Sequence, residues 1–182
     1  MYARLTDDRI VFVRPIRPGD KQMLADGLAQ LSAESVQKRF LGPKHGLSTA
    51  ELRYLTEVDG HDHFALVAMD AGEVEQIVAV ARFVRLAGDR YAAEAAITVC
   101  DDHQGLGLGT LLARRLTDAA RERGVERLTA SIASDNSPAL KLMRQIDERL
   151  RSAPVGSSVT ELVARLAVGD PPEPGLVEQS AA

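Results

Sequence analysis

The chain contains 182 residues, which is long enough for one domain with a sizeable core that needs neither disulfides nor metal ions. Its 22 Lys and Arg residues against 26 Asp and Glu residues give a formal charge of −4, which argues against nucleic acid as the main partner because phosphate binding needs a net positive surface. The sequence does not open on a basic segment followed by an apolar stretch, and no run of about 18 apolar residues occurs in it, so we expect a soluble, cytoplasmic protein with no membrane partner.

The first elements expected are one strand and three helices. The segment RIVFVRPI, residues 9–16, has the composition of a strand, and its prolines end it because they cannot continue a ladder. Residues 19–32 repeat apolar side chains at helical spacing after a capping Asp20. Two further helices, at 32–40 and 48–58, each open on a serine followed two or three residues later by a glutamate, which is a capping signal.

Three strands follow in a row and are expected to pair as antiparallel neighbours. They cover residues 63–69, 75–86 and 90–100, and only the short turn sequences DAGE and AGD separate them. Turns of that length join antiparallel strands, so the three strands are predicted to form a meander.

After Val99 the pattern changes to helix and then strand. From Leu108 the apolar positions fall on one helical face, and Gly124 stands where a helix C-cap belongs. Residues 127–134 have the pattern of a strand, and a crossover through one helix makes that strand parallel to the one at 90–100.

A second helix and a last strand complete the predicted fold. The segment NSPALKLMRQI predicts a helix with Ser137 as its cap and Pro138 at its first position, and residues 157–167 predict the strand. The fold class is therefore α/β, a mixed and mostly antiparallel sheet with a central parallel pair and flanking helices. We expect one domain over residues 1–168 and a disordered tail over 169–182, because the tail cannot bury apolar area.

Three alternating glycines, Gly105, Gly107 and Gly109, lie between a predicted strand and the first turn of a helix. Unpaired N–H groups at a helix start favour an anion, and glycine lets a phosphate approach the backbone closely. A nucleoside-triphosphate loop would need a lysine after its last glycine, but Thr110 follows Gly109 directly. A dinucleotide-binding fingerprint that starts at Gly105 would need glycine or alanine in place of Thr110. The alternative to an anion site is a loop in which glycine serves packing alone.

The segment QGLGLG, residues 104–109, resembles the Q/R-x-x-G-x-G/A signature of the GNAT superfamily of N-acetyltransferases. The resemblance extends over residues 9–167 and implies a GNAT fold in which the two parallel strands splay apart. It also implies acetyl-CoA as cosubstrate, with its pyrophosphate on the loop amides and its pantetheine along the end of the fourth strand. The cofactor-binding residues that it implies are Ile97, Thr98, Val99, Gln104, Gly105, Leu106, Gly107, Leu108, Gly109, Thr110 and Asn136.

Glu94 is the candidate general base. The run AAEAAITVCDDHQGLGLGTLL is similar to bacterial protein lysine acetyltransferases of this superfamily, and the base role of their fourth-strand glutamate is thereby implied for Glu94. Strand alternation places Glu94 on one face with Ala92, Ala96 and Thr98, which are small enough to leave room for a substrate. The alternative is a glutamate that only faces solvent on a half-exposed sheet.

Two positions depart from the family's pattern. Its loop often carries Arg or Lys where this chain has Leu106, so one ionic contact to phosphate is missing and the amides must suffice. The helix after Asn136 usually carries a tyrosine that protonates the leaving thiolate, but Met143 stands there and a thioether cannot donate a proton. Coenzyme A has a cysteine-like pKa of about 8.5, so its thiolate is a tolerable leaving group near neutral pH without an acid.

Other polar residues are expected to be structural. His61 and His63 have no further ligands at fixed spacing, so we expect no metal site. Cys100, the one cysteine, is expected to be a small buried residue and not an acyl-accepting nucleophile. His103 is expected to be an exposed loop residue.

The resemblance implies an acyltransferase that moves an acetyl group from acetyl-CoA to a primary amine by direct attack. A protein lysine is the leading acceptor and a small amine the next. A non-catalytic acyl-CoA-binding sensor is the alternative, favoured by Met143 and opposed by Glu94. A third reading is an interaction protein with a relic loop. The oligomeric state stays open, a homodimer included.

Overall fold

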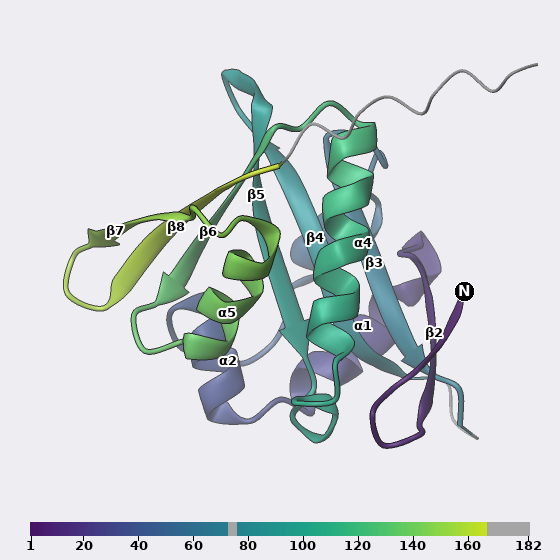
Figure 1. Cartoon of the computed structure of the whole chain (residues 1–182). Helices are drawn as coiled ribbons and strands as arrows, with labels where there is room; N and C mark the ends of the chain where they lie inside the picture. Colours follow the sequence, from purple (N-terminus) through teal and green to yellow (C-terminus); the bar gives the residue numbers. More distant parts are fainter. Residues whose placement is uncertain (73–75, 167–182) are drawn as a thin grey trace, which may run out of the picture.

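The backbone is organised around one mixed sheet. A computed structural model of the chain describes residues 1–72 and 76–166. Eight strands follow the order β1-β2-β3-β4-β5-β6-β8-β7, with β5 and β6 parallel and all other neighbours antiparallel (Figure 1). The strands are β1 (Tyr2–Arg4), β2 (Ile10–Pro15), β3 (His63–Asp70), β4 (Ile77–Leu86), β5 (Asp89–Val99), β6 (Arg127–Ala133), β7 (Arg151–Val155) and β8 (Val159–Arg165).

Helices pack on both faces of the sheet. α4 and α5 lie on one face, with α4 in front of β3 and β4, and α1 lies on the other face together with α2 and α3 (Figure 1). None of the helices in the described ranges is both long and apolar enough to cross a membrane. The helices are α1 (Lys21–Ala29), α2 (Ala33–Phe40), α3 (Thr49–Thr56), α4 (Leu108–Glu122) and α5 (Ser137–Ile146).

The predicted meander and crossover are confirmed. β3, β4 and β5 are consecutive antiparallel neighbours, and the chain passes from β5 through α4 to the parallel strand β6. α4 begins at Leu108, and Gly124 follows its end with a φ of +74°. Ser32 and Ser48 each accept a hydrogen bond from a backbone N–H in the first turn of α2 and of α3, as their capping signals predict.

Two edge strands were not predicted. β1 has only three residues, and β7, with the sequence RSAPV, is exposed along its whole length and contains Pro154. Neither strand alternates buried and exposed side chains, so the periodicity that identifies a strand is missing. The tail predicted over residues 169–182 lies outside the described residues.

The helix α5 is capped by Asn136 and not by Ser137, which corrects the prediction. The side-chain oxygen of Asn136 accepts a hydrogen bond of 3.2 Å from the N–H of Ala139, and Ser137 is the first residue of the helix. An asparagine side chain accepts from the third following amide as readily as serine does, so the two neighbouring residues compete for the cap.

Asp20 precedes α1 as predicted, but its carboxylate binds Arg14 of β2 and does not cap the helix. It accepts two hydrogen bonds from the guanidinium of Arg14, at 2.7 and 2.8 Å, and one of 2.8 Å from the N–H of Arg17. Burial raises the pKa of Asp20, but the hydrogen bonds and the charges of the two arginines together lower it by more. The buried carboxylate therefore stays ionised and ties the end of β2 to the start of α1.

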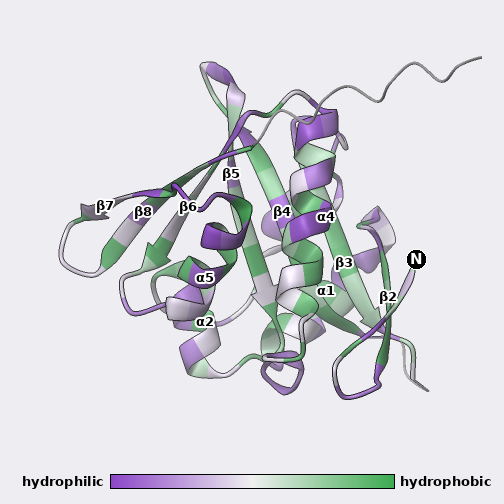
Figure 2. Cartoon of the chain, viewed as in Figure 1, coloured by the Kyte–Doolittle hydropathy of each residue, from purple (hydrophilic) through white to green (hydrophobic). Residues whose placement is uncertain are grey.

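The main core lies between α4 and the sheet. Figure 2 shows hydrophobic and hydrophilic residues alternating along α4, in front of largely hydrophobic β3 and β4. The leucines Leu108, Leu112 and Leu116 are at most 1% exposed and pack against the side chains of β4 and β5. This packing holds the start of α4, and so the glycine loop before it, against the sheet.

Leu112→Ala should lower the free energy of unfolding by about 2 to 5 kcal/mol, because it removes buried methyl groups and leaves a cavity under α4. Urea denaturation followed by circular dichroism measures the change. The control is Leu86→Ala at the exposed end of β4, where we expect a loss within about 0.5 kcal/mol. Equal losses in the two variants would show that α4 does not hold the core.

Candidate active site

A cleft opens where β5 and β6 separate. The two strands pair only over Ala92–Glu94 and Arg127–Thr129, and then they diverge (Figure 1). The cleft has a volume of about 310 Å³. Its walls are formed by β5, β6, α2 and α5 and by Ala113 and Leu116 in the middle of α4.

The far half of β5 keeps one backbone edge unpaired. From Ala95 to Val99 this strand is bonded to β4, while its other edge faces the opening toward β6. Ile97 lines the cleft, whereas Thr98 points through the sheet to a pocket on the opposite face. The carbonyl of Val99 accepts a hydrogen bond of 3.0 Å from the side chain of Gln104. The three predicted pantetheine-binding residues therefore have different surroundings. The side chain of Ile97 faces the cleft, that of Thr98 lines the pocket on the opposite face, and the carbonyl of Val99 already accepts a hydrogen bond.

The backbone conformation requires glycine at two of the three positions in the loop. Gly105 and Gly107 have φ values of +74° and +84°, a left-handed conformation that other residues rarely adopt. Gly109 has no such requirement, and a Cβ atom there would lie 3.4 Å from a methyl group of Leu142 in α5, which is an ordinary van der Waals contact. Backbone geometry therefore explains Gly105 and Gly107, whereas no contact among the described residues requires glycine at position 109.

The loop presents a row of unpaired donors. Within the described residues, no acceptor is bonded to the N–H groups from Gly105 to Thr110, and Gly107 is the N-cap of α4. The carbonyl of Leu106 accepts from the N–H of Thr6, which fixes the loop against the N-terminal segment. Free amides at the start of a helix, reinforced by its dipole, form a site for an anion such as phosphate.

One carboxylate joins the loop to α2. Asp101 accepts hydrogen bonds from the N–H of Ser32 at 2.9 Å, from its hydroxyl at 2.8 Å and from the hydroxyl of Ser35 at 2.7 Å. The side chain of Gln104 donates to the same Ser35 hydroxyl at 3.1 Å. The start of α2 is therefore hydrogen-bonded to the segment just before the glycine loop. No sequence motif predicts this contact.

Glu94 lies on the wall of the cleft. It is the last residue of β5 that pairs with β6, and its exposed side chain faces the cleft beside Lys38 and Arg39 of α2. Burial lowers the pKa of Arg39, and the charge of Glu94 raises it, so the two groups are close enough to interact electrostatically. Met143 of α5 lines the same cleft and is 6% exposed. The structure brings the predicted base and the predicted tyrosine position together across one opening.

Asn136 also lines the cleft. Its side-chain oxygen caps α5, while its side-chain nitrogen has no acceptor among the described residues. The nitrogen is therefore an available donor at the mouth of the cleft.

His103 is buried, so the prediction of an exposed loop histidine was wrong. Its side chain is 5% exposed, and its Nε2 atom lies 3.0 Å from the guanidinium of Arg9, which also donates to the carbonyl of Asp102 at 2.6 Å. Burial and the charge of Arg9 lower the pKa of His103. It lines neither the cleft nor the pocket on the opposite face. His103 is therefore a neutral packing residue beneath the loop.

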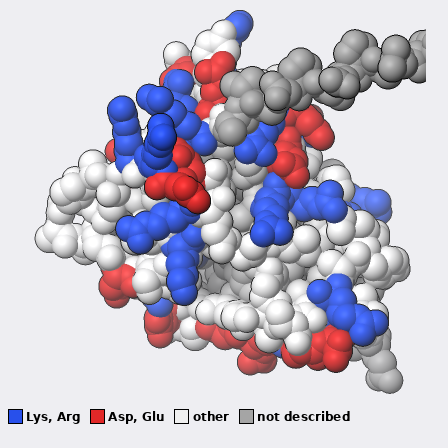
Figure 3. Space-filling model, viewed as in Figure 1, with Lys and Arg blue, Asp and Glu red and all other residues white. Residues whose placement is uncertain are grey.

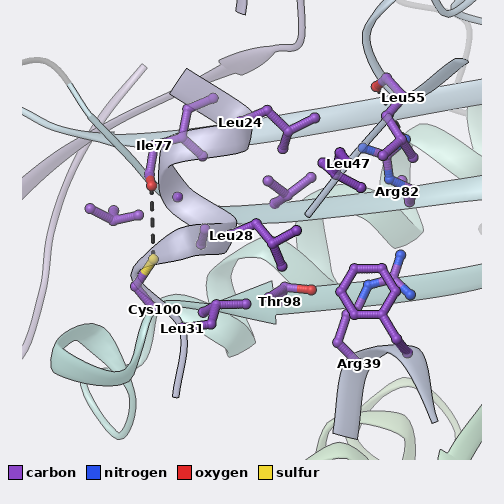
Figure 4. Close-up of a pocket in the computed structure, with 15 residues that line it drawn as sticks. Leu24, Leu28, Leu31, Arg39, Leu47, Leu55, Ile77, Arg82, Thr98 and Cys100 are labelled. Carbon is purple, nitrogen blue, oxygen red and sulfur yellow. Dashed lines mark hydrogen bonds between the residues drawn. The ribbon is translucent and has the colours of Figure 1, made fainter. Parts of the chain in front are cut away.

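A second, narrower pocket lies on the opposite face of the sheet, between α1, α2, α3 and the strands β4 and β5 (Figure 4). Its volume is about 80 Å³. Cys100 lies at one end, with its thiol donating to the carbonyl of Ile77 at 3.8 Å. Burial, and then the charges of Asp101 and Asp102, raise the pKa of Cys100, so the thiol stays protonated. The residue is half-buried, whereas a buried residue was expected.

Arg39 and Arg82 form the other end of this pocket, and no sequence pattern indicates a role for Arg82. Arg82 lies in a strand of apolar residues, and Arg39 ends a helix, so neither forms a motif. Only the fold brings their side chains to one place (Figure 4).

Cations gather on the face that carries the cleft. Figure 3 shows Lys and Arg side chains over α4 and over α5, on either side of a largely uncharged strip. Exposed residues of this kind are Arg114 and Arg115 on α4 and Lys141 and Arg144 on α5. Despite the net charge of −4, this face therefore favours an anionic ligand. Within the described ranges, no three His, Cys, Asp or Glu side chains are grouped so as to hold a metal ion.

A family model described as the acetyltransferase (GNAT) family matches residues 32–146. The chain belongs to the GNAT acetyltransferase family. The match runs from the cap of α2 to the end of α5, so it includes the glycine loop and the cleft walls of this GNAT chain. The GNAT resemblance and the α/β GNAT fold predicted from the sequence are confirmed.

Individual relatives agree with this assignment. The GNAT chain is 35% identical to Acetyltransferase Pat of Mycolicibacterium smegmatis over 168 residues, which is 92% of this chain and 50% of that protein. It is 33% identical to Acetyltransferase PA5475 of Pseudomonas aeruginosa over 144 residues, which is 78% of this chain and 74% of that protein. The solved GNAT domain of S. lividans PAT matches with a TM-score of 0.79 at 28% identity, over 91% of this chain and 96% of that one. The chain thus spans about half the length of the mycobacterial relative.

Thr110→Asp should weaken acetyl-CoA binding at least about tenfold, because it adds a negative charge beside the free amides of the loop. Stability should hold or rise slightly, since an acidic residue in a helix's first turn interacts favourably with the dipole. Calorimetry measures the affinity, and Thr110→Asn, similar in size and uncharged, is the control. Equal affinities for both variants would exclude this loop as the pyrophosphate site.

His63 gives the fold a predictable dependence on pH. It is 8% exposed, and burial and the charge of Arg82 lower its pKa to about 4. Below pH about 6.5 the unfolded chain binds a proton at His63 that the folded chain does not, so stability should fall as the pH decreases from about 6.5 to about 4. His63→Gln should reduce this fall, measured by urea denaturation across that range, whereas His45→Gln in an exposed loop should preserve it. An unchanged profile in His63→Gln would mean that the histidine titrates normally.

Proposed function

We propose that the chain transfers an acetyl group from acetyl-CoA to a primary amine by direct attack, with Glu94 as the general base. The observation that carries the proposal is the position of Glu94 on the wall of the cleft, on the strand that leads into a loop of free amides. Such a reaction needs a base for the amine, a strand edge that binds the cofactor and a site for its phosphates. One short stretch of this chain carries a carboxylate, an open strand edge and a loop of free amides.

We assign the cofactor to the cleft and the loop. The pyrophosphate would bind the N–H groups of the glycine loop, and the pantetheine would lie along the free edge of β5 at Ile97–Val99, with Asn136 as a donor at the mouth. The cations on α4 and α5 compensate for the missing charge at Leu106, because they raise the potential on the same face. Thr98 would contribute through its backbone, since its side chain lies on the other face.

The amine needs a base. An alkylammonium with a pKa of about 10.4 is neutral at pH 7 only about once in 2,500 molecules, a deficit of some 4.6 kcal/mol. Glu94 is exposed to the cleft, so it would accept the proton either directly or through a water that it orders. As the amine nitrogen bonds to the acetyl carbon, the thioester bond breaks and the sulfur leaves as a thiolate.

Departure of the thiolate would proceed without a protein acid. Met143, which lines the cleft where the family commonly has a tyrosine, has no proton to donate. A thiol with a pKa of about 8.5 is a tolerable leaving group near neutral pH, so water would supply the proton afterwards.

A protein lysine is the first acceptor to test, because the run around Glu94 resembles the bacterial protein lysine acetyltransferases, and a small amine is the second. The second candidate function is a non-catalytic acyl-CoA sensor, which Met143 favours. Acetyl-CoA binding without thiol release across a panel of lysine peptides and amines would select the sensor.

Glu94→Gln should lower kcat by about 10² or more while acetyl-CoA affinity changes by no more than a few fold, because the amide keeps the shape of the carboxylate but cannot accept the proton. The loss should shrink as the pH rises and free amine becomes available. Release of free thiol measures kcat. Glu161→Gln on the exposed face of β8 is the matched control and should retain parental kcat. Parental kcat in Glu94→Gln at neutral pH would leave Glu94 as a solvent-facing residue.

A further inference from the structure

Two arginines form one end of the apolar pocket behind the sheet. Arg82 of β4 is 6% exposed, and Arg39 of α2 points toward the same space (Figure 4). The body of the pocket is made by aliphatic side chains, four of which are Leu24, Leu28, Leu47 and Leu55. A largely apolar cavity that has two cations at one end has the character of a site for an amphipathic anion.

In the part of the chain that the structure describes, the hydrogen-bond partners of Arg82 are neutral. Its guanidinium donates to the carbonyl of Leu55 at 3.2 Å and lies 3.0 Å from Nε2 of His63. Because the pKa of His63 is about 4, the imidazole is neutral at pH 7 and accepts the hydrogen bond. These contacts orient Arg82, but within residues 1–72 and 76–166 no carboxylate contacts its guanidinium to balance the positive charge.

Arg39 is even less engaged. Within residues 1–72 and 76–166 it forms no hydrogen bond or ion pair, and its guanidinium carbon lies 5.1 Å from the centre of the Phe40 ring. Glu94 acts on it only over a longer distance. Burial, and then the positive charge of Arg39, lower the pKa of Arg82 to about 10, so the two like charges lie close enough to repel each other.

Arg82 is buried and Arg39 is half-buried, and no carboxylate among the described residues contacts either guanidinium. Two like charges placed in this way are costly, because a protein interior solvates charge poorly. A carboxylate between them would remove the repulsion and could form paired hydrogen bonds with each guanidinium. We infer that the pocket binds a carboxylate of the acceptor, and that the preferred acceptor joins an amine to a carboxylate and a small apolar group, as an apolar free amino acid does.

The position of Arg39 connects this site to the proposed chemistry. Arg39 lines both the apolar pocket and the cleft, and Glu94 faces it from the cleft side. An acceptor held by its carboxylate at Arg39 has its apolar group in the pocket, and its amine lies on the side of Glu94. The inference rests on the proposed acetyl transfer, and the same chemistry has a second source, an acidic side chain beside a protein lysine.

Matched acceptors separate the two sources. Leucine against leucinamide tests the carboxylate of a free amino acid, and a Glu-Lys against a Gln-Lys peptide tests an acidic neighbour. We expect kcat/KM, measured by thiol release, to be at least about tenfold higher for leucine than for leucinamide. A preference confined to the peptide pair would support the carboxylate site and assign it to a protein acceptor. Equal values within both pairs would overturn the inference.

Variants of Arg39 connect the preference to the pocket. Arg39→Gln should abolish the preference for the carboxylate, and Arg39→Lys, which keeps the charge but loses the planar fork, should retain part of it. Arg53→Gln on the exposed face of α3 removes the same charge outside both cavities and should leave the preference intact. A full preference in a folded Arg39→Gln protein would overturn the inference.

A binding measurement separates this inference from the proposed function. The probe is 4-methylpentanoate, which has the carboxylate and apolar group of leucine but no amine and so cannot be acetylated. Calorimetry with the coenzyme A-bound protein should show binding that Arg39→Gln weakens at least about tenfold and Arg53→Gln does not. If no amine is acetylated, the proposed function fails, and this titration alone decides the carboxylate site. Absence of binding to the parent protein, or equal binding to Arg39→Gln, would overturn it.

Discussion

The separation of β5 from β6 is the constraint on which the rest of the site depends. These two strands share only three paired positions, Ala92–Glu94 with Arg127–Thr129. Backbone groups that a continuous sheet would pair therefore remain available along the end of β5, and such groups are costly unless water or a ligand bonds them. The separation also produces the cleft, so one departure from regular pairing provides both its space and its hydrogen-bonding edge.

The elements around the opening keep it from closing. α4 covers the sheet face beside it with fully buried leucines, and α5 packs beside α4 and forms another wall of the cleft. On the other face, α2 covers the end of β5 and brings Arg39 to the junction of cleft and pocket. Regular packing thus supports an irregular opening, which is how a rigid fold can present reactive groups in fixed positions.

The sequence predicted what depends on local pattern. The meander, the crossover and the glycine loop follow from periodicity and turn composition, and the position of Glu94 at a cleft agrees with the GNAT resemblance. It could not predict what depends on distant packing. Arg82 and Arg39 are separated by more than forty positions and form no motif, and the buried His103 contacts Arg9, which lies 94 positions earlier in the chain. The edge strands β1 and β7 were missed because exposed edges lack the alternation of buried side chains.

The carboxylate of Asp101 connects the glycine loop to α2, the helix that carries Arg39. It is bonded to the first turn of α2 and lies four residues before the first loop glycine, while Arg39 lies near the far end of that same helix, about 10 Å away at 1.5 Å per residue. Because a helix of eight residues behaves as one rigid element, the glycine loop and Arg39 are both attached to the same element. A displacement of the loop amides on binding an anion would therefore also displace α2 and, with it, Arg39 at the edge of the pocket. A ligand on the loop and a ligand at Arg39 would then be energetically coupled without touching each other.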